Sequence, residues 1–357
     1  MHPAFWKARR VLVTGHTGFK GAWLSKWLQT MGTELLGISL APRTEPNAFT
    51  AMRCAAGMQS VFADIRQFDI LHDAVAAFRP EVVFHLAAQS LVKEGYADPV
   101  GTYSTNVLGT VHVLQLARQI QSINALVNVT SDKCYENRDL GRGYRENDPL
   151  GGNDPYSSSK ACAEIVTSAF SKSFLVPGVA QRQVAIATAR AGNVVGGGDW
   201  AADRLIPDLV RGAVEGTPVL IRNPSATRPW QHVLEPLSGY LMLAEALVRR
   251  DAEASGAWNF GPGEEGDRPV SWLADRFSVA WGKGSSWSVD RSPHAHEARM
   301  LKLDSSKARE LLHWHPRLSL DEALDASVAW YKAYYSKQDM HSFTLGQIAS
   351  YLGKSRR

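Results

Sequence analysis

The chain opens with a short apolar segment, a turn of regularly spaced glycines and a run of apolar residues at helical spacing. Residues 10–14 form the apolar segment, and Trp23, Trp27 and Met31 mark one helix face. A helix that starts after such a turn offers free backbone N–H groups and the positive end of its dipole, which suit a pyrophosphate. Glycine also serves tight turns, but the strand and helix on either side favour a dinucleotide site. The predicted contacts are Gly15, Thr17, Gly18, Phe19, Lys20 and Gly21.

Strands and helices alternate through the first 190 residues. Alternation of this kind implies parallel strand pairing with right-handed crossovers. The sequence therefore predicts an α/β fold, a Rossmann-type doubly wound parallel sheet. The predicted strands are 10–14, 34–40, 61–63, 82–86, 125–130 and 184–190. The predicted helices that follow the first one lie around 68–78, 106–118 and 157–174.

Beyond residue 190 the pattern loosens, and glycines and prolines separate shorter segments. A last strand is expected near 258–261. We expect a smaller substrate lobe that is interleaved with the sheet, and a binding cleft between the two. The predicted division is 1–190 plus about 236–262 for the dinucleotide, about 191–235 and 267–340 for the substrate, and 341–357 as a C-terminal tail.

Composition excludes several classes of protein. The formal net charge of +4 is too small and dispersed for a nucleic-acid-binding surface, and nowhere do 18 apolar residues run together as in a membrane span. Cys54, Cys134 and Cys162 are odd in number and lack C-x-x-C spacing, so neither a disulfide framework nor a metal site is expected. With no signal-like N-terminal segment, the chain is expected to be cytoplasmic.

The second and third strands contribute further predicted cofactor contacts. Asp64 and Ile65 follow the third strand, where they would meet an adenine. The end of the second strand usually carries an acid that holds the ribose hydroxyls of NAD. In this chain the segment is Ser-Leu-Ala-Pro-Arg and contains no acid. Because an arginine at this position can bind the 2′-phosphate of NADP, Arg43 leaves the choice between NAD and NADP open.

Tyr156 and Lys160 lie four residues apart at the start of the predicted helix at 157–174. This spacing places both on one helix face, where the ammonium can favour the phenolate. A tyrosine with a lowered pKa would be a base near neutral pH. A solvated helix face has the same pattern, so the spacing alone does not decide between the two.

Together with the glycine turn, residues 86–89 and Asn106, this pair resembles the extended short-chain dehydrogenase/reductase family, the NAD-dependent epimerases and dehydratases. The resemblance covers nearly the whole chain, and most members act on nucleotide sugars. It implies a homodimer or homotetramer. It also implies further cofactor contacts from Leu86, Ala87, Ala88, Gln89, Asn106, Thr130, Tyr156, Lys160 and Arg190.

Ser131, Asp132 and Lys133 follow the fifth predicted strand, where side chains reach the cleft. A 4-epimerase needs only to remove and return a hydride. A sugar 4,6-dehydratase also needs a base for the carbon 5 proton and an acid for the leaving 6-hydroxyl. Asp132 is the predicted acid, and Lys133 is the predicted base, directly or through Asp132 or a water. The alternative is an Asp–Lys surface pair of little energetic value.

Five longer strings narrow the resemblance to one branch of that family, the CDP-glucose 4,6-dehydratases. It implies catalytic roles for Ser131, Asp132, Lys133, Tyr156 and Lys160, and a tightly bound NAD that is recycled because its hydride returns to the sugar. UDP-N-acetylglucosamine dehydratases and 4-epimerases are the alternatives. An ordinary dehydrogenase and a non-catalytic dinucleotide sensor are less favoured. The strings are residues 130–137, 143–146, 154–160, 191–200 and 228–233.

The substrate of such an enzyme carries two phosphates, which the arginine fork binds well. Arginines of the second lobe are therefore candidates, of which about two are expected to touch the ligand, with Arg228 and Arg299 preferred. Polar residues near the sugar complete the prediction. The predicted substrate contacts are Gln89, Ser131, Asn193, Arg204, Arg222, Arg228 and Arg299.

Overall fold

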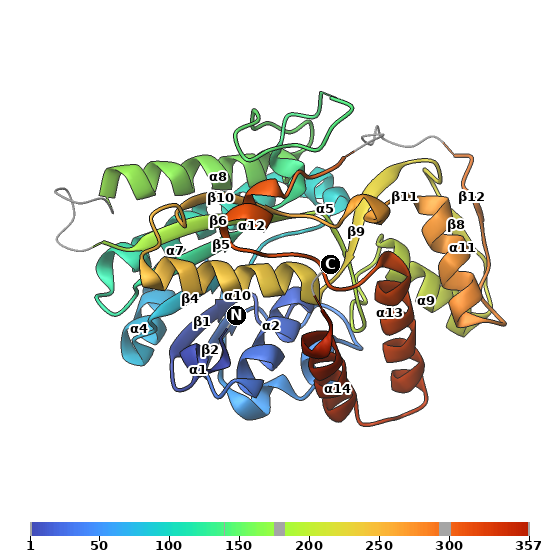
Figure 1. Cartoon of the computed structure of the whole chain (residues 1–357), viewed down its shortest axis with the longest axis horizontal. Coiled ribbons are helices and arrows are strands. Elements are labelled where there is room, and N and C mark those ends of the chain that lie inside the picture. Colours follow the sequence, from blue (N-terminus) through green and yellow to red (C-terminus); the bar gives the residue numbers. More distant parts are fainter. Residues whose placement is uncertain (1, 139, 175–182, 293–300, 356–357) are drawn as a thin grey trace.

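A seven-stranded, all-parallel sheet forms the centre of the computed structural model, which describes residues 2–138, 140–174, 183–292 and 301–355 (Figure 1). The strand order is β10-β6-β5-β4-β1-β2-β3, so the direction of winding reverses between β1 and β4. This confirms the predicted doubly wound sheet. The strands are β1 (Arg10–Thr14), β2 (Glu34–Ser39), β3 (Gln59–Phe62), β4 (Val82–His85), β5 (Ala125–Val129), β6 (Ala185–Ala191) and β10 (Gly256–Phe260).

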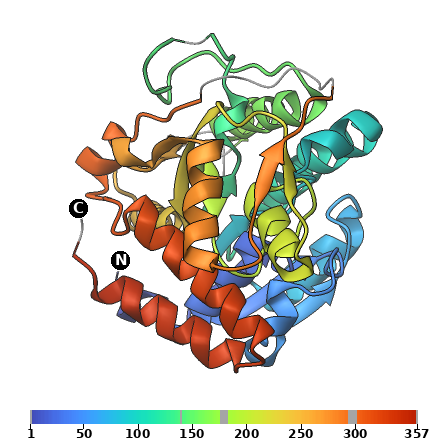
Figure 2. The ribbon, with the colours of Figure 1, turned by 90° about the vertical axis from the view of Figure 1, so that its right-hand side faces the viewer.

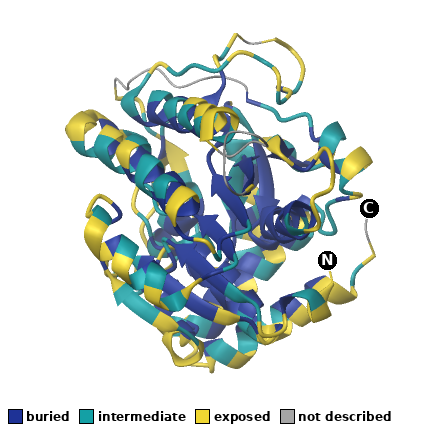
Figure 3. Ribbon diagram, turned by 90° about the vertical axis from the view of Figure 1, so that its left-hand side faces the viewer, coloured by how far each residue is buried: buried dark blue, intermediate teal, exposed yellow. Residues whose placement is uncertain are grey.

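Successive side chains of a strand point to opposite sides of the sheet. Because these side chains are apolar on both sides, helices cover both faces. Val11 and Val13 of β1 enter one core and Leu12 enters the other. Figure 3 shows the buried strands between helices whose outer faces are exposed. The first core contains α1 (Pro3–Trp6), α2 (Phe19–Thr30) and α10 (Leu234–Arg249), and the second contains α4 (Phe68–Phe78), α7 (Gly109–Gln119) and α8 (Pro155–Phe174).

Smaller elements lie beyond the carboxyl ends of the strands, mostly on the right of Figure 1. Helix α11 contacts both α9 and α13, and Figure 2 shows it, in orange, beside the red C-terminal helices. Strands β7, β9 and β11 form a three-stranded sheet, and β8 pairs with β12. The bounds are β7 (Asn193–Val195), α9 (Leu205–Glu215), β8 (Val219–Ile221), β9 (Thr227–His232), β11 (Asp267–Pro269), α11 (Val270–Trp281), β12 (Trp287–Val289) and α13 (Leu320–Tyr335).

Short helical segments join these layers. The helix predicted around 106–118 is α7, preceded by the π-helical turn η2. Within the described residues, no helix has both the length and the apolar character that a membrane crossing needs. The short segments are α3 (Ala48–Ala51), η1 (Cys54–Gly57), α5 (Val92–Ala97), α6 (Pro99–Tyr103), η2 (Ser104–Leu108), η3 (Asp132–Cys134), η4 (Glu264–Gly266) and α12 (Ser306–Leu311).

The predicted C-terminal tail, 341–357, requires a correction. Most of it forms α14 (Met340–Gly353), in which Ile348 and Tyr351 are buried in the first core. The Tyr351 hydroxyl donates a hydrogen bond of 2.8 Å to Glu235 of α10. Because apolar side chains recur on one face of this segment, it packs against the sheet domain instead of extending into solvent.

Candidate active site

A cavity of about 1320 Å³ opens at the carboxyl ends of the central strands. It lies at the ends of β1 and β4, the neighbouring strands between which the winding reverses, where doubly wound sheets bind ligands. Pockets for one small molecule usually measure about 300–1,000 Å³. The walls come both from the glycine turn and from the segment around β7 and β9, so the cavity has room for two ligands side by side.

The glycine turn forms one wall, and its conformation requires glycine. Gly15 has a positive φ of 75°, and a Cβ built on it would lie 2.7 Å from the backbone nitrogen of Ala87. A Cβ on Gly21 would lie 2.1 Å from the Gly15 carbonyl oxygen. The turn therefore packs directly against the residues after β4 and starts α2 at the cavity. Such a cradle of backbone N–H groups fits a pyrophosphate.

Most predicted cofactor contacts lie in the walls of this cavity. Thr17 connects the turn to the end of β2, since its hydroxyl bonds to Ser39 Oγ at 2.8 Å and to the Leu40 carbonyl at 2.9 Å. Their role in binding stays a prediction. The lining members of the predicted set are Gly15, Thr17, Gly18, Phe19, Lys20, Gly21, Asp64, Ile65, Leu86, Ala87, Ala88, Gln89, Thr130, Tyr156 and Lys160.

Two predicted cofactor contacts, Asn106 and Arg190, do not line the cavity. Asn106 is buried behind it, where its amide pairs with the backbone N–H and carbonyl of Gln89, each at 2.9 Å. Arg190 is 2% exposed and forms a bidentate pair with Glu164 of α8 at 2.8 and 2.9 Å. Asn106 therefore positions the chain after β4, and Arg190 fastens α8 to β6.

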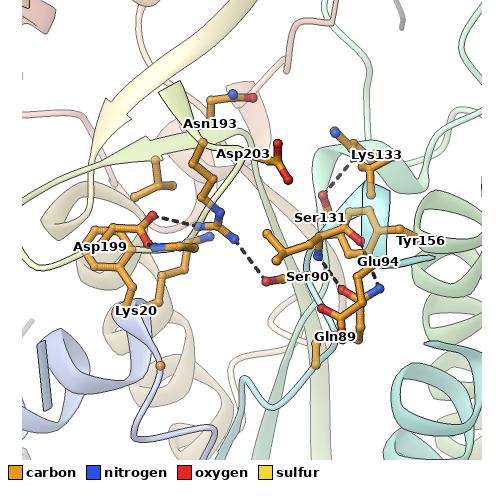
Figure 4. Close-up of a pocket in the computed structure, with 18 of the residues that line it drawn as sticks. Lys20, Gln89, Ser90, Glu94, Ser131, Lys133, Tyr156, Asn193, Asp199 and Asp203 are labelled. Carbon is orange, nitrogen blue, oxygen red and sulfur yellow. Dashed lines mark hydrogen bonds and ion pairs between the residues drawn. The ribbon is translucent and has the colours of Figure 1, made fainter. Parts of the chain in front are cut away.

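The five predicted catalytic residues come together at one side of the cavity. Ser131, Asp132 and Lys133 follow β5, while Tyr156 and Lys160 lie in the first turns of α8. Ser131 Oγ donates to Asp132 Oδ1 at 2.9 Å, and Lys133 Nζ lies 5.9 Å from the centroid of the Tyr156 ring. Figure 4 shows Ser131, Lys133 and Tyr156 on one side and Lys20 and Asp199 on the other.

Asp132 is not part of a solvated surface pair, because it is 3% exposed. Its Oδ2 atom is buried and has no hydrogen-bond partner among the described residues. Burial raises the pKa of this carboxyl, although the Lys133 charge and the Ser131 hydrogen bond oppose the shift. An unpaired buried oxygen with a raised pKa favours the protonated acid, the state that can give a proton to a leaving group.

The expected low pKa of Tyr156 is not found. Burial raises the pKa of Tyr156 to about 12, while a hydrogen bond with Ser131 acts to lower it. Burial also lowers the pKa of Lys160 to about 8, and its ammonium donates to the Val129 carbonyl at 3.3 Å. The spacing placed both side chains correctly, but the prediction neglected the cost of burying two charges in one wall.

Of the predicted substrate contacts, Gln89 and Ser131 also line the cavity, and the others come from the segments after β6. Asn193, Arg204, Arg222 and Arg228 all line the cavity, and the Arg228 charge acts on Asp132. Arg204 donates to Asp199 at 3.0 Å and to Ser90 Oγ at 3.1 Å, which ties this wall to the segment after β4. Arg299 lies outside the described residues. Contact of these arginines with phosphate stays a prediction.

Sequence reasoning missed two ion pairs at the cavity mouth, both made by α5. Glu94 forms two hydrogen bonds with the Arg43 guanidinium, at 2.8 and 2.9 Å, and Lys93 pairs with Asp203. All four residues line the cavity. No local pattern identifies these partners, because Arg43 and Glu94 are 51 residues apart in the chain.

Comparison with known proteins identifies the family of this chain. The model of the NAD dependent epimerase/dehydratase family matches residues 11–261. A CDP-glucose 4,6-dehydratase from Salmonella typhimurium is 51% identical over 99% of this chain and 99% of its own length. A UDP-glucose 4-epimerase from Mycolicibacterium smegmatis is 25% identical over 90% of this chain and 98% of its own length.

Solved structures share the fold. A crystal structure of dTDP-glucose 4,6-dehydratase from Bacillus anthracis in complex with NAD superposes with a TM-score of 0.75 at 22% identity, covering 93% of this chain and 99% of that one. The doubly wound sheet is thus a fold that this chain shares with solved structures. The family model and the relative with 51% identity show that this chain belongs to the NAD dependent epimerase/dehydratase family.

Proposed function

We propose that this chain removes water from CDP-D-glucose to give CDP-4-keto-6-deoxy-D-glucose, with NAD as a tightly held, recycled cofactor. The observation that carries the proposal is the buried acid Asp132 beside Lys133 and Tyr156 in one cavity wall. An epimerase has no step for this acid and base. The 51% identity to a CDP-glucose 4,6-dehydratase supports the choice of nucleotide and sugar.

The glycine turn and the ends of β2, β3 and β4 would hold the cofactor. When bound, NAD supplies a reversible hydride acceptor that takes the hydride of carbon 4 and returns it to carbon 6. Lys20 and the N-terminal N–H groups of α2 suit its pyrophosphate. Asp64 and Ile65 lie in the wall beyond them, where an adenine would fit.

Tyr156 is the base that takes the proton of the sugar 4-hydroxyl, and Lys160 stabilises the phenolate. Burial raises the pKa of Tyr156 to about 12, so the phenolate depends on nearby positive charge to form. Once carbon 4 is a ketone, the carbon 5 proton is acidic and Lys133 removes it. Asp132 protonates the 6-hydroxyl, which leaves as water.

The protons balance over one turnover. Lys133 returns its proton to carbon 5 when carbon 6 regains the hydride. Tyr156 ends protonated and Asp132 ends ionised, so one proton passes from the phenol side to the carboxylate before the next cycle. Ser131 suits this transfer, because its hydroxyl donates to Asp132 at 2.9 Å and also bonds to Tyr156. The net change is the loss of one water from the sugar.

The nucleotide diphosphate would lie along the wall of Asn193, Arg222 and Arg228. We therefore keep the proposal that residues about 191–235 and 267–340 bind the substrate and that residues 1–190 plus about 236–262 bind the cofactor. We also propose a homodimer or homotetramer that acts in the cytoplasm, supplying 4-keto-6-deoxy sugars for surface polysaccharides.

The proposal is tested with a panel of CDP-, UDP- and dTDP-activated hexoses, followed by mass spectrometry and absorbance of NADH. We expect loss of one water from CDP-glucose without accumulation of NADH. Accumulation of NADH in step with product would indicate an ordinary dehydrogenase. A product of unchanged mass would indicate an epimerase.

The role of Lys133 is tested by exchange of the carbon 5 proton with heavy water. A Lys133→Ala variant should lose exchange and dehydration by at least about 100-fold while still oxidising carbon 4. Lys172→Ala, which removes an exposed lysine at the far end of α8, is the matched control and should exchange normally. Unaltered exchange in Lys133→Ala would remove Lys133 from this step.

A further inference from the structure

Arg43 is a cation at a position where NAD-binding proteins usually carry an acid. It follows β2 by four residues and lines the cavity beside Ser39 and Leu40. Thr17 fastens this strand end to the glycine turn through hydrogen bonds of 2.8 and 2.9 Å. In doubly wound sheets the adenosine ribose lies at this junction, and an arginine there accommodates the 2′-phosphate of NADP.

The structure shows that this arginine already has an anionic partner. Its two terminal nitrogens donate to the two carboxylate oxygens of Glu94, at 2.9 and 2.8 Å. The Glu94 side chain is 32% exposed and the Arg43 side chain 61% exposed, so both remain at the cavity mouth. The preceding residue, Lys93, pairs with Asp203, so α5 contributes two ion pairs to the cavity mouth.

This geometry opposes a 2′-phosphate in two ways. A phosphate carries about two negative charges and binds arginine best through the same two-pronged contact that Glu94 occupies. To bind it, Arg43 would have to release Glu94, whose carboxylate would then repel the phosphate at close range. The two ribose hydroxyls of NAD carry no charge and meet neither obstacle.

We infer that Glu94 is a specificity-determining residue, which selects NAD over NADP by occupying the guanidinium of Arg43. The inference rests on the proposed function, since it concerns the cofactor of that site. Glu94 acts through Arg43 and takes no part in the reaction at the sugar. Removing its charge should therefore raise the affinity for NADP relative to that for NAD.

The test measures dissociation constants of NAD and NADP for the full-length, cofactor-depleted protein by calorimetry. Glu94→Gln keeps the shape of the side chain without its charge, and Glu94→Ala removes both. We expect each variant to bind NADP about tenfold more tightly than the parent, the gain of one charge-assisted contact, with NAD affinity within about twofold. The double variant Arg43→Ala/Glu94→Gln should lose the gain.

The matched control is Glu136→Gln, which also removes one acid from an exposed Arg–Glu pair but lies outside the cavity walls. Its affinity for NADP should equal that of the parent. Unchanged NADP affinity in Glu94→Gln, or an equal gain in the double variant or in Glu136→Gln, overturns the inference. If dehydration with NAD persists in that case, the proposed function still holds. A parent protein that binds no NAD contradicts both.

Discussion

Two arginine–glutamate pairs of similar geometry lie in different regions of the molecule. Arg190 and Glu164 join β6 to α8 behind the catalytic wall, with side chains 3% and 4% exposed. Arg43 and Glu94 join the end of β2 to α5 at the cavity mouth, with side chains 61% and 32% exposed. Each pair has two hydrogen bonds between 2.8 and 2.9 Å.

Burial, and not bonding geometry, separates their roles. Glu164 also accepts hydrogen bonds from Thr130 and Thr188, so its carboxylate connects α8 to two strands. Neither charge of this pair can exist alone in the core. At the mouth, water can replace either partner at little cost, which leaves Arg43 and Glu94 free to respond to a ligand.

The largest expected effect comes from breaking the buried pair. Glu164→Gln leaves the Arg190 guanidinium without its counter-charge and should lower the free energy of unfolding by about 3–5 kcal/mol. Denaturant titration followed by circular dichroism measures this change. A loss below about 1 kcal/mol would show that the buried pair behaves like an exposed one, and burial would then not distinguish the two pairs.

Glu235 is a buried carboxyl with fewer compensating charges than Glu164, so it measures the effect of burial separately from that of an ion pair. Glu235 accepts hydrogen bonds from the backbone N–H groups of Arg317 and Leu318 and from Tyr351, and burial raises its pKa to about 7 from 4.5. Because the folded state holds this proton more tightly, its contribution to stability is present below pH 4.5 and is lost as the pH rises to 7.

We therefore expect the free energy of unfolding of the parent to fall by about 3 kcal/mol over that range relative to Glu235→Gln. Parallel denaturant titrations of both proteins at several pH values isolate this contribution from that of other carboxylates. Equal pH profiles of the two proteins would assign Glu235 an ordinary pKa and remove the effect.

The smallest effect is expected at the cavity mouth. Arg43→Ala should change the free energy of unfolding by at most about 1 kcal/mol, because the exposed pair is solvated in both states. The same titration measures it. A loss comparable with that of Glu164→Gln would mean that the mouth pair holds the fold together.

Features carried by the backbone and by short spacings were predictable from the sequence. The glycine turn, the alternation of strands and helices and the Tyr156–Lys160 spacing each depend on residues close together in the chain. They placed the sheet, the cavity and the five clustered side chains correctly. Asp132 and Lys133 were found because they directly follow a strand whose carboxyl end faces the cleft.

Properties set by distant partners were not predictable. Arg190 was predicted to contact the cofactor because no residue near it in the sequence indicates that its partner is Glu164. The pKa of Tyr156 depends on burial, which the spacing of Tyr156 and Lys160 does not reveal. The C-terminal helix α14 was taken for a tail because its anchor, Glu235, lies 116 residues from Tyr351. In each case a tertiary contact outweighed the local pattern.

Transfer of the hydride within the sugar tests the central claim most directly. CDP-glucose carrying deuterium at carbon 4 is incubated with the protein in ordinary water, and the product is examined by mass spectrometry and NMR. We expect a dehydrated product with the deuterium at carbon 6. Deuterium that remains at carbon 4, or that leaves the sugar for solvent or for accumulated NADH, would contradict it.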